Sequence, residues 1–169
     1  MFKKFQSKIS NLPFFYQWII LVKMNDKIST SFSQFKEIIP PKDRFWADPF
    51  VLYKNNKHYV FFEECEYFNN KGYLSVMTFD NDGNHSNPIK ILECDYHLSY
   101  PSIFEFNDDL YLIHATTHNS KSYIELFKCE NFPLKWKFDR KLIKDIPLVD
   151  TTIFFYDNKW WIFGCKAEL

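Results

Sequence analysis

Residues 48–62 read DPFVLYKNNKHYVFF, and two later segments of the chain repeat this pattern. Residues 100–114 read YPSIFEFNDDLYLIH, and residues 150–164 read DTTIFFYDNKWWIFG. The three segments align without a gap, and their starts lie roughly 50 residues apart. Each holds an apolar run, an Asn/Asp-rich turn and a second run rich in aromatic residues. A repeat of this length and content is typical of the blades of a β-propeller.

The first repeat unit is predicted to contain four antiparallel strands, at residues 50–53, 58–63, 73–79 and 89–93. Asn and Asp tolerate the left-handed backbone that tight hairpin turns require, so a turn of this kind is expected between the first two strands of every unit. The second unit repeats all four strands, whereas the third supplies two. Two further strands are expected before the first unit, at residues 16–23 and 35–39.

These strands add up to about three blades, because four antiparallel strands make one blade. Closed propellers use roughly four to eight blades, so such an arc is incomplete. We therefore expect an all-β chain in which residues 16–169 form a partial propeller of the five-bladed type, preceded by a tail at residues 1–15. We interpret the chain as a fragment or truncated gene product. A smaller β-sandwich is the alternative fold.

Composition excludes several classes of function. The formal net charge is zero and both signs are interspersed, so nucleic-acid binding is not expected. No stretch reaches the ~18–20 apolar residues of a membrane span. The four cysteines form no CxxC pair and the chain has three glycines, so we expect no metal, no cofactor and no phosphate-cradling loop. We expect these four cysteines to be reduced thiols, which favours a cytoplasmic location.

Equivalent positions of a propeller face one central axis, so Asp48 and Asp150 should lie near each other. Two carboxyl groups, one protonated and one ionised, are what glycoside hydrolysis requires. The same two groups could instead bind the hydroxyl groups of a sugar. They could also cap their strands by accepting backbone N–H bonds. The residues alone leave these three interpretations open.

Four motifs occur in an order and at a spacing that resemble a known family; they are Phe45-Trp46-Ala47-Asp48-Pro49-Phe50, residues 59–64, residues 96–101 and residues 149–154. The resemblance is to the N-terminal domain of plant glucosamine inositolphosphorylceramide transferases and to bacterial relatives, which occur alone or beside sugar formyltransferase domains. That domain is similar to five-bladed propeller glycosidases of the arabinanase, xylosidase and levanase kind. The resemblance implies a carbohydrate-active or carbohydrate-binding domain in bacterial glycoconjugate or surface-polysaccharide metabolism.

In those glycosidases, carboxylates from the first three blades serve as base or nucleophile and as proton donor. The resemblance places Asp48 at the first of these positions and Asp150 at the third, whereas the second opening carries Tyr100 and no carboxylate. This departure leaves open whether the chain is a hydrolase that uses Asp48 and Asp150, a binding module, or a scaffold for a glycosyltransferase or formyltransferase partner. The ligand expected is a carbohydrate, a sugar nucleotide or a glycolipid.

Three polar residues near the predicted axis are further candidates for ligand binding. Glu63 and Glu64 are adjacent on a strand and therefore point to opposite faces, so at most one of them faces the axis. His97 lies in the segment that enters the second unit, where it could donate to a sugar hydroxyl or tune the protonation of Asp48. A structural hydrogen bond is the alternative role for this histidine.

The aromatic residues divide into two groups. Trp46 and Tyr100 border the openings of the first and second units, and are candidate platforms on which the C–H face of a sugar could stack. Trp160 and Trp161 lie inside a predicted strand of the third unit. We expect those two side chains to pack in the core rather than bind a ligand.

Overall fold

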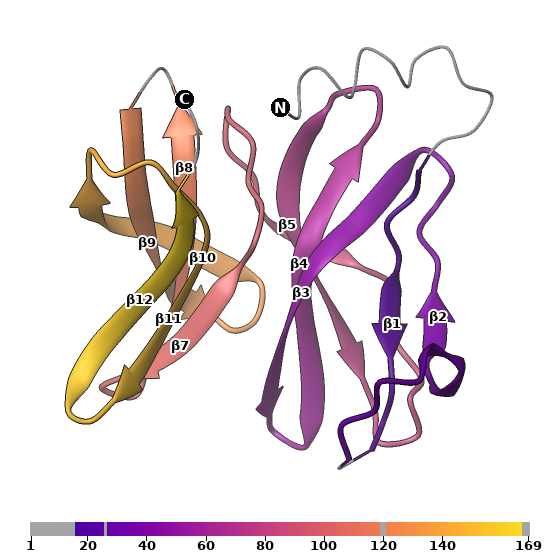
Figure 1. Cartoon of the computed structure of the whole chain (residues 1–169). Helices are drawn as coiled ribbons and strands as arrows, with labels where there is room; N and C mark the ends of the chain where they lie inside the picture. Colours follow the sequence, from indigo (N-terminus) through magenta and orange to yellow (C-terminus); the bar gives the residue numbers. More distant parts are fainter. Residues whose placement is uncertain (1–15, 26, 119–120, 167–169) are drawn as a thin grey trace.

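The computed structural model of the chain describes residues 16–25, 27–118 and 121–166 (Figure 1). Among these residues, every regular element is a β-strand except one short 3-10 turn, η1 (Phe32–Gln34). The described residues contain no helix that is long and apolar enough to cross a membrane. The tail expected at residues 1–15 lies outside the described residues, so the domain boundary stays a prediction.

Two four-stranded antiparallel sheets form the centre of the molecule. The first blade contains, in spatial order, β3 (Arg44–Lys54), β4 (Lys57–Glu66), β5 (Lys71–Phe79) and β6 (Ile89–Leu92). The second blade contains β7 (Ser102–Phe106), β8 (Asp109–His118), β9 (Lys121–Asn131) and β10 (Lys135–Lys144). In each sheet, strands that follow one another in the chain are neighbours in space. This is the arrangement that the sequence repeat predicted for a propeller blade.

Two-stranded sheets lie on either side of this pair of blades. One consists of β1 (Ile20–Val22) and β2 (Lys36–Ile38), and the other of β11 (Leu148–Tyr156) and β12 (Lys159–Lys166). Figure 1 shows the β1–β2 sheet beside the first blade and the β11–β12 sheet beside the second. The described strands thus form a partial propeller arc of about three blades, as expected, and the alternative of a β-sandwich was wrong. That the complete propeller has five blades stays a prediction.

The hairpin turns predicted in the three repeat units are present. In each, two successive residues have positive φ values near 50–63°, which is the mark of a type I′ turn. The residues are Asn55 and Asn56 in the first unit, Asn107 and Asp108 in the second, and Asp157 and Asn158 in the third. The recurring Asn/Asp pairs therefore fix the register of all three hairpins.

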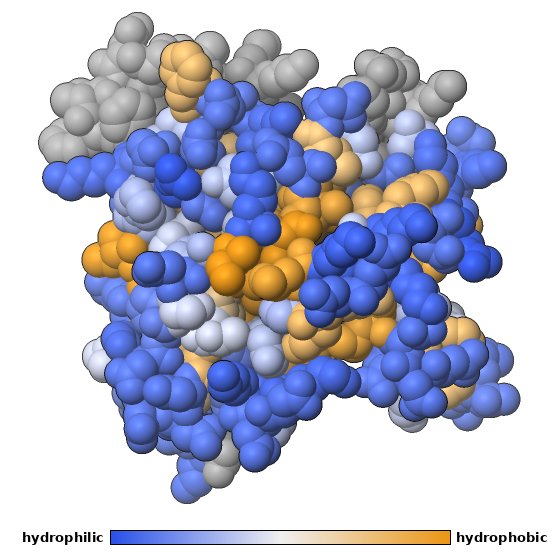
Figure 2. Space-filling view, turned by 180° about the vertical axis from the view of Figure 1, so that it is seen from behind, coloured by the Kyte–Doolittle hydropathy of each residue, from blue (hydrophilic) through white to orange (hydrophobic). Residues whose placement is uncertain are grey.

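Each sheet packs against its neighbour through a separate apolar cluster. Phe61 and Leu112, both fully buried, lie in the cluster between the first and second blades. Phe62, the next residue along β4, points to the other face and packs with Ile20 of β1. A third cluster joins the second blade to β11 through Ile153. Seen from behind, the surface is mostly hydrophilic, with a compact group of apolar side chains near its middle (Figure 2).

The two tryptophans of β12 depart from the core packing expected for them. Trp160 faces the second blade, where its ring lies 5.0 Å from that of Phe104 between centroids, although 38% of the residue is exposed. Trp161 points the opposite way, stacks near Phe163, and is 42% exposed. The expectation was wrong for Trp161, because the described residues supply no further sheet to cover that face of β11–β12.

Candidate functional site

One residue in each of the three repeat openings adopts the left-handed backbone conformation: Asp48 (φ 53°), Tyr100 (φ 49°) and Asp150 (φ 53°). The pairing of β3 with β4 shifts in register at the first of these openings, and that of β11 with β12 shifts at the third. Such a β-bulge bends its strand and redirects a side chain. The same backbone device therefore recurs at positions that the sequence repeat predicted to be equivalent.

The three openings lie together at what we call the hub, made of Asp48, Glu63, His97, Tyr100 and Asp150. The backbone N–H of Tyr100 donates to the carboxyl group of Asp48, and the charge of Asp150 acts on the same group. The hydroxyl oxygen of Tyr100 lies 3.0 Å from Oγ1 of Thr152, the second residue after Asp150. The structure thus brings together the two aspartates that the sequence singled out, while their roles stay a prediction.

The surroundings of Asp48 in the hub perturb the protonation of its carboxyl group. Burial raises the pKa of its carboxyl group to about 6, and the negative charges of Glu63 and Asp150 act in the same direction. A hydrogen bond between the side chains of Asp48 and Glu63 raises this pKa further, whereas the N–H of Tyr100 lowers it. Asp48 can therefore carry a proton near pH 6 while a neighbouring carboxylate accepts a hydrogen bond.

Glu63 lies near the end of β4, opposite Ala47, and is only 5% exposed. Its Oε1 atom lies 3.1 Å from Nε2 of His97, and the backbone N–H of Gly72 donates to Nδ1 of the same ring at 3.0 Å. Because Nδ1 accepts a hydrogen bond, the proton of the neutral ring is on Nε2, which donates it to Glu63. A chain of hydrogen bonds therefore runs from the backbone of β5 to Asp48.

Gly72 is a site residue that the sequence analysis missed. A Cβ atom at this position would lie 2.5 Å from the carbonyl oxygen of Leu98 and 2.9 Å from Oε1 of Glu63. The close approach of the loop around His97 to β5 thus requires glycine. The signal available was that only three glycines occur in the whole chain.

Donor atoms of Glu63, Cys65 and His97 lie within 4.8 Å of one another, which is close enough for all three to contact one metal ion. The Nε2 atom of His97 carries the ring proton and offers no lone pair to a cation, since Nδ1 is occupied by the N–H of Gly72. Burial raises the pKa of the Cys65 thiol to about 12, and the charge of Glu63 adds to this effect. The donor set therefore fits a hydrogen-bond chain better than a metal centre.

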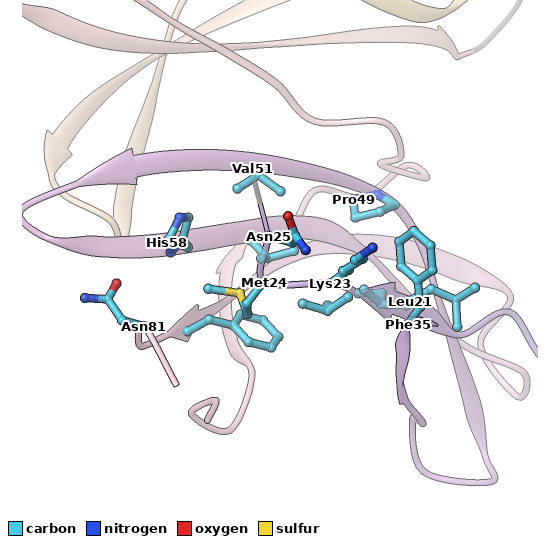
Figure 3. Close-up of a pocket in the computed structure, with 13 residues that line it drawn as sticks. Leu21, Lys23, Met24, Asn25, Phe35, Pro49, Val51, His58 and Asn81 are labelled. Atoms are coloured by element: carbon cyan, nitrogen blue, oxygen red, sulfur yellow. The ribbon is translucent and has the colours of Figure 1, made fainter. Parts of the chain in front are cut away.

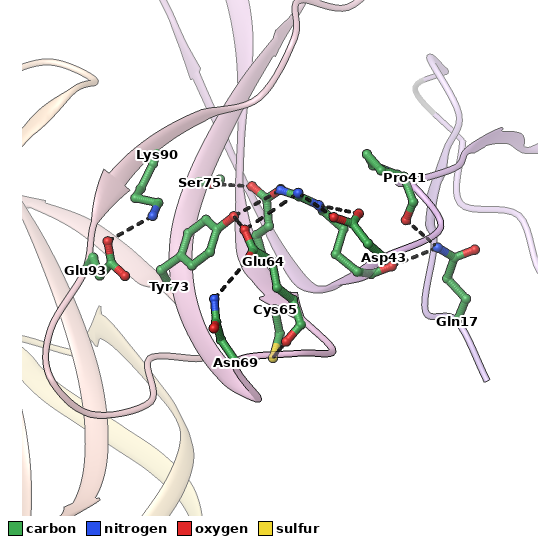
Figure 4. A network of polar contacts seen from close by, with 12 residues as sticks. Gln17, Pro41, Asp43, Glu64, Cys65, Asn69, Tyr73, Ser75, Lys90 and Glu93 are labelled. Atoms are coloured by element: carbon green, nitrogen blue, oxygen red, sulfur yellow. Dashed lines mark hydrogen bonds and ion pairs between the residues drawn. The ribbon is translucent and has the colours of Figure 1, made fainter. Parts of the chain in front are cut away.

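Glu64 lies on the face of β4 opposite to Glu63 and takes part in a separate network (Figure 4). Its Oε1 accepts a hydrogen bond from Nη1 of Arg44 at 2.9 Å, and its Oε2 accepts one from the hydroxyl of Ser75 at 2.7 Å. Arg44 also pairs with Asp43. The structure therefore places Glu64 in an ion-pair network of the first blade and not at the hub with the other candidates.

The prediction that Trp46 forms a platform on which a sugar stacks was wrong. The residue is 5% exposed, and its ring lies 5.3 Å from that of Phe62 between centroids. It packs in the cluster that joins the first blade to Ile20 of β1. Adjacent residues of a strand point to opposite faces, and Trp46 lies on the face of Glu64 rather than that of Glu63.

A second buried histidine lies beneath the opening of the second blade and was not singled out from the sequence. His114 is 1% exposed, and its Nδ1 lies 2.9 Å from the carbonyl oxygen of Ser99. Burial lowers the pKa of His114 to about 4, so the ring is neutral at physiological pH. His114 stacks on Tyr96, whose hydroxyl group donates to Glu125. These contacts hold the segment that carries His97 and Tyr100.

A groove lies elsewhere, between β1–β2 and the first blade (Figure 3). Its volume is about 750 Å³, and its walls include Leu21, Met24, Pro49 and Val51. The lining mixes apolar and polar side chains and contains none of the hub residues. The hub, rather than this groove, gathers the carboxyl and hydroxyl groups that could recognise a polar ligand.

An arc of four-stranded antiparallel blades whose openings lie together defines a propeller-type domain. A sequence model of the family described as "Glucosamine inositolphosphorylceramide transferase 1, N-terminal" matches residues 27–169, and the chain belongs to this family. It is 31% identical over 121 residues to glucosamine inositolphosphorylceramide transferase 1 of Arabidopsis thaliana, a match that covers 71% of this chain and 15% of the relative. The protein of that name from Oryza sativa subsp. indica is 32% identical over 121 residues, covering 71% and 16%. The chain thus spans only about a sixth of the curated relatives it matches.

Solved structures show the same fold in glycoside hydrolases. A Bombyx mori GH32 beta-fructofuranosidase matches with a TM-score of 0.60 at 13% identity, covering 76% of this chain and 31% of that one. An alpha-L-arabinofuranosidase from Lactobacillus brevis matches with a TM-score of 0.59 at 12% identity, covering 83% and 51%. These neighbours confirm the propeller-type fold, and the family match confirms the resemblance given by the four sequence motifs.

Proposed function

We propose that the chain binds a carbohydrate at the hub and serves bacterial glycoconjugate or surface-polysaccharide metabolism from the cytoplasm. The observation that carries this proposal is the convergence of three repeat openings, each redirected by a left-handed residue. Asp48, Glu63 and Asp150 offer acceptors there, and Tyr100 offers a hydroxyl group and an aromatic ring. Sugar hydroxyl groups need such a mixture of donors and acceptors beside an apolar surface. The ligand is a sugar, free or as part of a sugar nucleotide or glycolipid.

An array of printed oligosaccharides, including glucosamine-terminated ones, tests this proposal. Wild-type chain should bind a subset of the glycans, and Asp48→Gly and Asp150→Gly should each weaken binding at least tenfold. Glycine removes the carboxyl group and tolerates the left-handed backbone at both sites. Asp157→Gly is the matched control, because Asp157 has φ 51° in the hairpin turn of the third repeat. Wild-type binding by both hub variants, or no binding by the wild type, would overturn the proposal.

Glycoside hydrolysis by Asp48 and Asp150 is a second candidate, favoured by the state of Asp48. A carboxyl group with a pKa of about 6 beside a second carboxyl group is the arrangement that acid–base catalysis uses. If the chain is a hydrolase, Asp48→Asn should reduce turnover of a chromogenic arabinoside or fructoside by at least 100-fold. The melting temperature should stay within a few degrees of the wild type. Binding of a glycan without turnover would exclude hydrolysis and would support only the binding proposal.

The partner proposed for the domain is a glycosyltransferase. The support is that the chain matches an N-terminal family domain of proteins named as transferases and spans about 15% of the Arabidopsis relative. A sugar-binding propeller beside a transferase would hold the acceptor glycan while another domain transfers the next sugar. A sugar formyltransferase is the alternative partner. Co-purification of tagged chain with either enzyme from the source cell would distinguish them.

A further inference from the structure

One hydrogen-bond chain in the hub links Gly72, His97, Glu63 and Asp48 in that order. We propose that His97 is a positioning residue whose Nε2–H holds the Glu63 carboxyl group as the hydrogen-bond acceptor, so that the proton shared by the two carboxyl groups resides on Asp48. Asp48 then donates its O–H to Glu63 and presents its other carboxyl oxygen to the ligand as an acceptor. This inference deepens the proposed function and depends on it only for the identity of the ligand.

The direction of the hydrogen bonds determines how His97 acts. The N–H of Gly72 has no alternative but to donate, so Nδ1 of His97 must accept and Nε2 must carry the proton. That proton points at Oε1 of Glu63, 3.1 Å away. Because Oε1 of Glu63 accepts this hydrogen bond, His97 fixes the Glu63 carboxyl group as an acceptor. Asp48, hydrogen-bonded to Glu63, is then the carboxyl group that keeps the proton.

The ring of His97 is held in place although about half of its side chain is exposed. The next residue, Leu98, is fully buried and its N–H donates to the carbonyl oxygen of Gly72 at 2.9 Å. The N–H of Gly72 returns a bond to the ring at 3.0 Å. These two bonds fasten the loop to β5 from both sides, and the Cβ-free surface of Gly72 allows the close approach. The imidazole therefore cannot turn away from Glu63 without breaking its hydrogen bond with the N–H of Gly72.

The other groups around Asp48 act in a consistent way. Asp150 approaches from β11, and its charge, like that of Glu63, disfavours the negative charge on Asp48. The N–H of Tyr100 is the one opposing contact, since it donates to Asp48. Cys65, which lies beside Glu63 on β4, stays a neutral thiol. Loss of the His97 bond should therefore move the shared proton towards Glu63 rather than release it from the hub.

A titration of the aspartate and glutamate side-chain carboxyl carbons by NMR tests the inference in the whole chain. In the wild type, Asp48 should titrate near pH 6. In His97→Ala its midpoint should fall by about one pH unit, because Glu63 is then no longer held as the acceptor of the proton on Asp48. His97→Gln, whose amide can donate to Glu63, should restore the wild-type midpoint. His85→Ala is the control, because His85 is exposed and its Nδ1 lies against the carbonyl of Ser86.

An Asp48 midpoint that does not change in a folded His97→Ala protein would overturn the inference, as would a wild-type Asp48 that titrates near 3.8. Should His97→Ala not fold, Glu63→Gln decides the matter, because loss of the accepting charge must also lower the Asp48 midpoint. The titration needs no ligand. If the Asp48 midpoint falls in His97→Ala but the wild type binds no glycan on the array, the proposed function is refuted and this inference stands. If the wild type binds glycans but the Asp48 midpoint does not change in His97→Ala, this inference is refuted and the proposed function stands.

Discussion

The first and third repeats open with the same residue in the same backbone conformation, yet the two aspartates have different surroundings. Asp48 and Asp150 both have φ 53°. Asp48 is partly buried and hydrogen-bonded to Glu63, whereas Asp150 is exposed. In the third repeat, Cys165 stands at the position that corresponds to Glu63. The repeat therefore determines where a carboxyl group lies, and the non-repeated neighbours determine how far it is buried and which groups it contacts.

The same contrast extends to the packing of the two regions. Phe61 and Phe163 occupy equivalent positions of the repeat, but Phe61 is fully buried and Phe163 is 54% exposed. The strand β4 pairs with β3 and β5, whereas β12 pairs among the described strands with β11 alone. Identical side chains at equivalent positions should therefore contribute very different amounts to stability.

The largest effect should come from removing these two phenylalanines in turn. Phe61→Ala should lower the free energy of unfolding by about 3–5 kcal/mol, because it leaves a cavity between the first and second blades. Phe163→Ala, its matched control, should cost less than about 1 kcal/mol, because half of its ring already contacts solvent. Urea unfolding of both variants measures the difference. Equal losses would show that the β11–β12 sheet is as well packed as the first blade.

A smaller effect should separate the two aspartates as a function of pH. The pKa of Asp48 is raised in the folded state from 3.8 to about 6, so its contribution to stability is fully present below pH 3.8 and is lost as the pH rises through 6. Asp48→Asn keeps a hydrogen-bond donor towards Glu63 and carries no charge. The variant should therefore gain on the wild type between pH 4 and pH 7, by about 1–2 kcal/mol once partial exposure of the site is allowed for.

Asp150→Asn provides the comparison, because Asn tolerates the same left-handed backbone. Thermal unfolding should be followed from pH 4 to pH 8 for both variants and for the wild type. The stability of Asp48→Asn relative to the wild type should rise with pH. This rise should be larger than the corresponding change for Asp150→Asn. A parallel pH dependence of Asp48→Asn and the wild type would mean that Asp48 ionises in the folded chain as it does in water.

Much of the fold could be read from the sequence because the repeat carries it. The Asn/Asp pairs predicted three type I′ turns, and all three have the expected left-handed residues. The N-terminal strand pair was also expected, although β1 and β2 are shorter than predicted. Packing across the sheets was harder to predict, since the alternation along a strand says which residues share a face but not whether another sheet covers it. This is why Trp46 and Trp161 were assigned to the wrong environments.

The hub shows the same division between local and long-range information. Equivalence of Asp48 and Asp150 follows from aligned repeats, so their meeting could be predicted. The choice of Glu63 over Glu64 could not, because it depends on which face of β4 turns towards the second blade. The function of Gly72 depends on a contact with a loop 25 residues further along the chain, which leaves no local signal. Residues that act through such long-range contacts can be identified only from the structure.

The smallest effect concerns the link between the second and third openings. Tyr100→Phe removes the hydroxyl group that lies 3.0 Å from Oγ1 of Thr152 and keeps the ring, so it should cost about 0.5–1 kcal/mol. Because this bond joins β11 to the second opening, amide hydrogen exchange should increase in β11–β12 and stay unchanged in the first blade. Tyr53→Phe is the control, since the hydroxyl of Tyr53 makes only a long 3.4 Å contact with Asn56 at an exposed turn. Faster exchange in the first blade as well would mean that the half-blade and the complete blades unfold as one unit, and that their difference in packing does not make them independent.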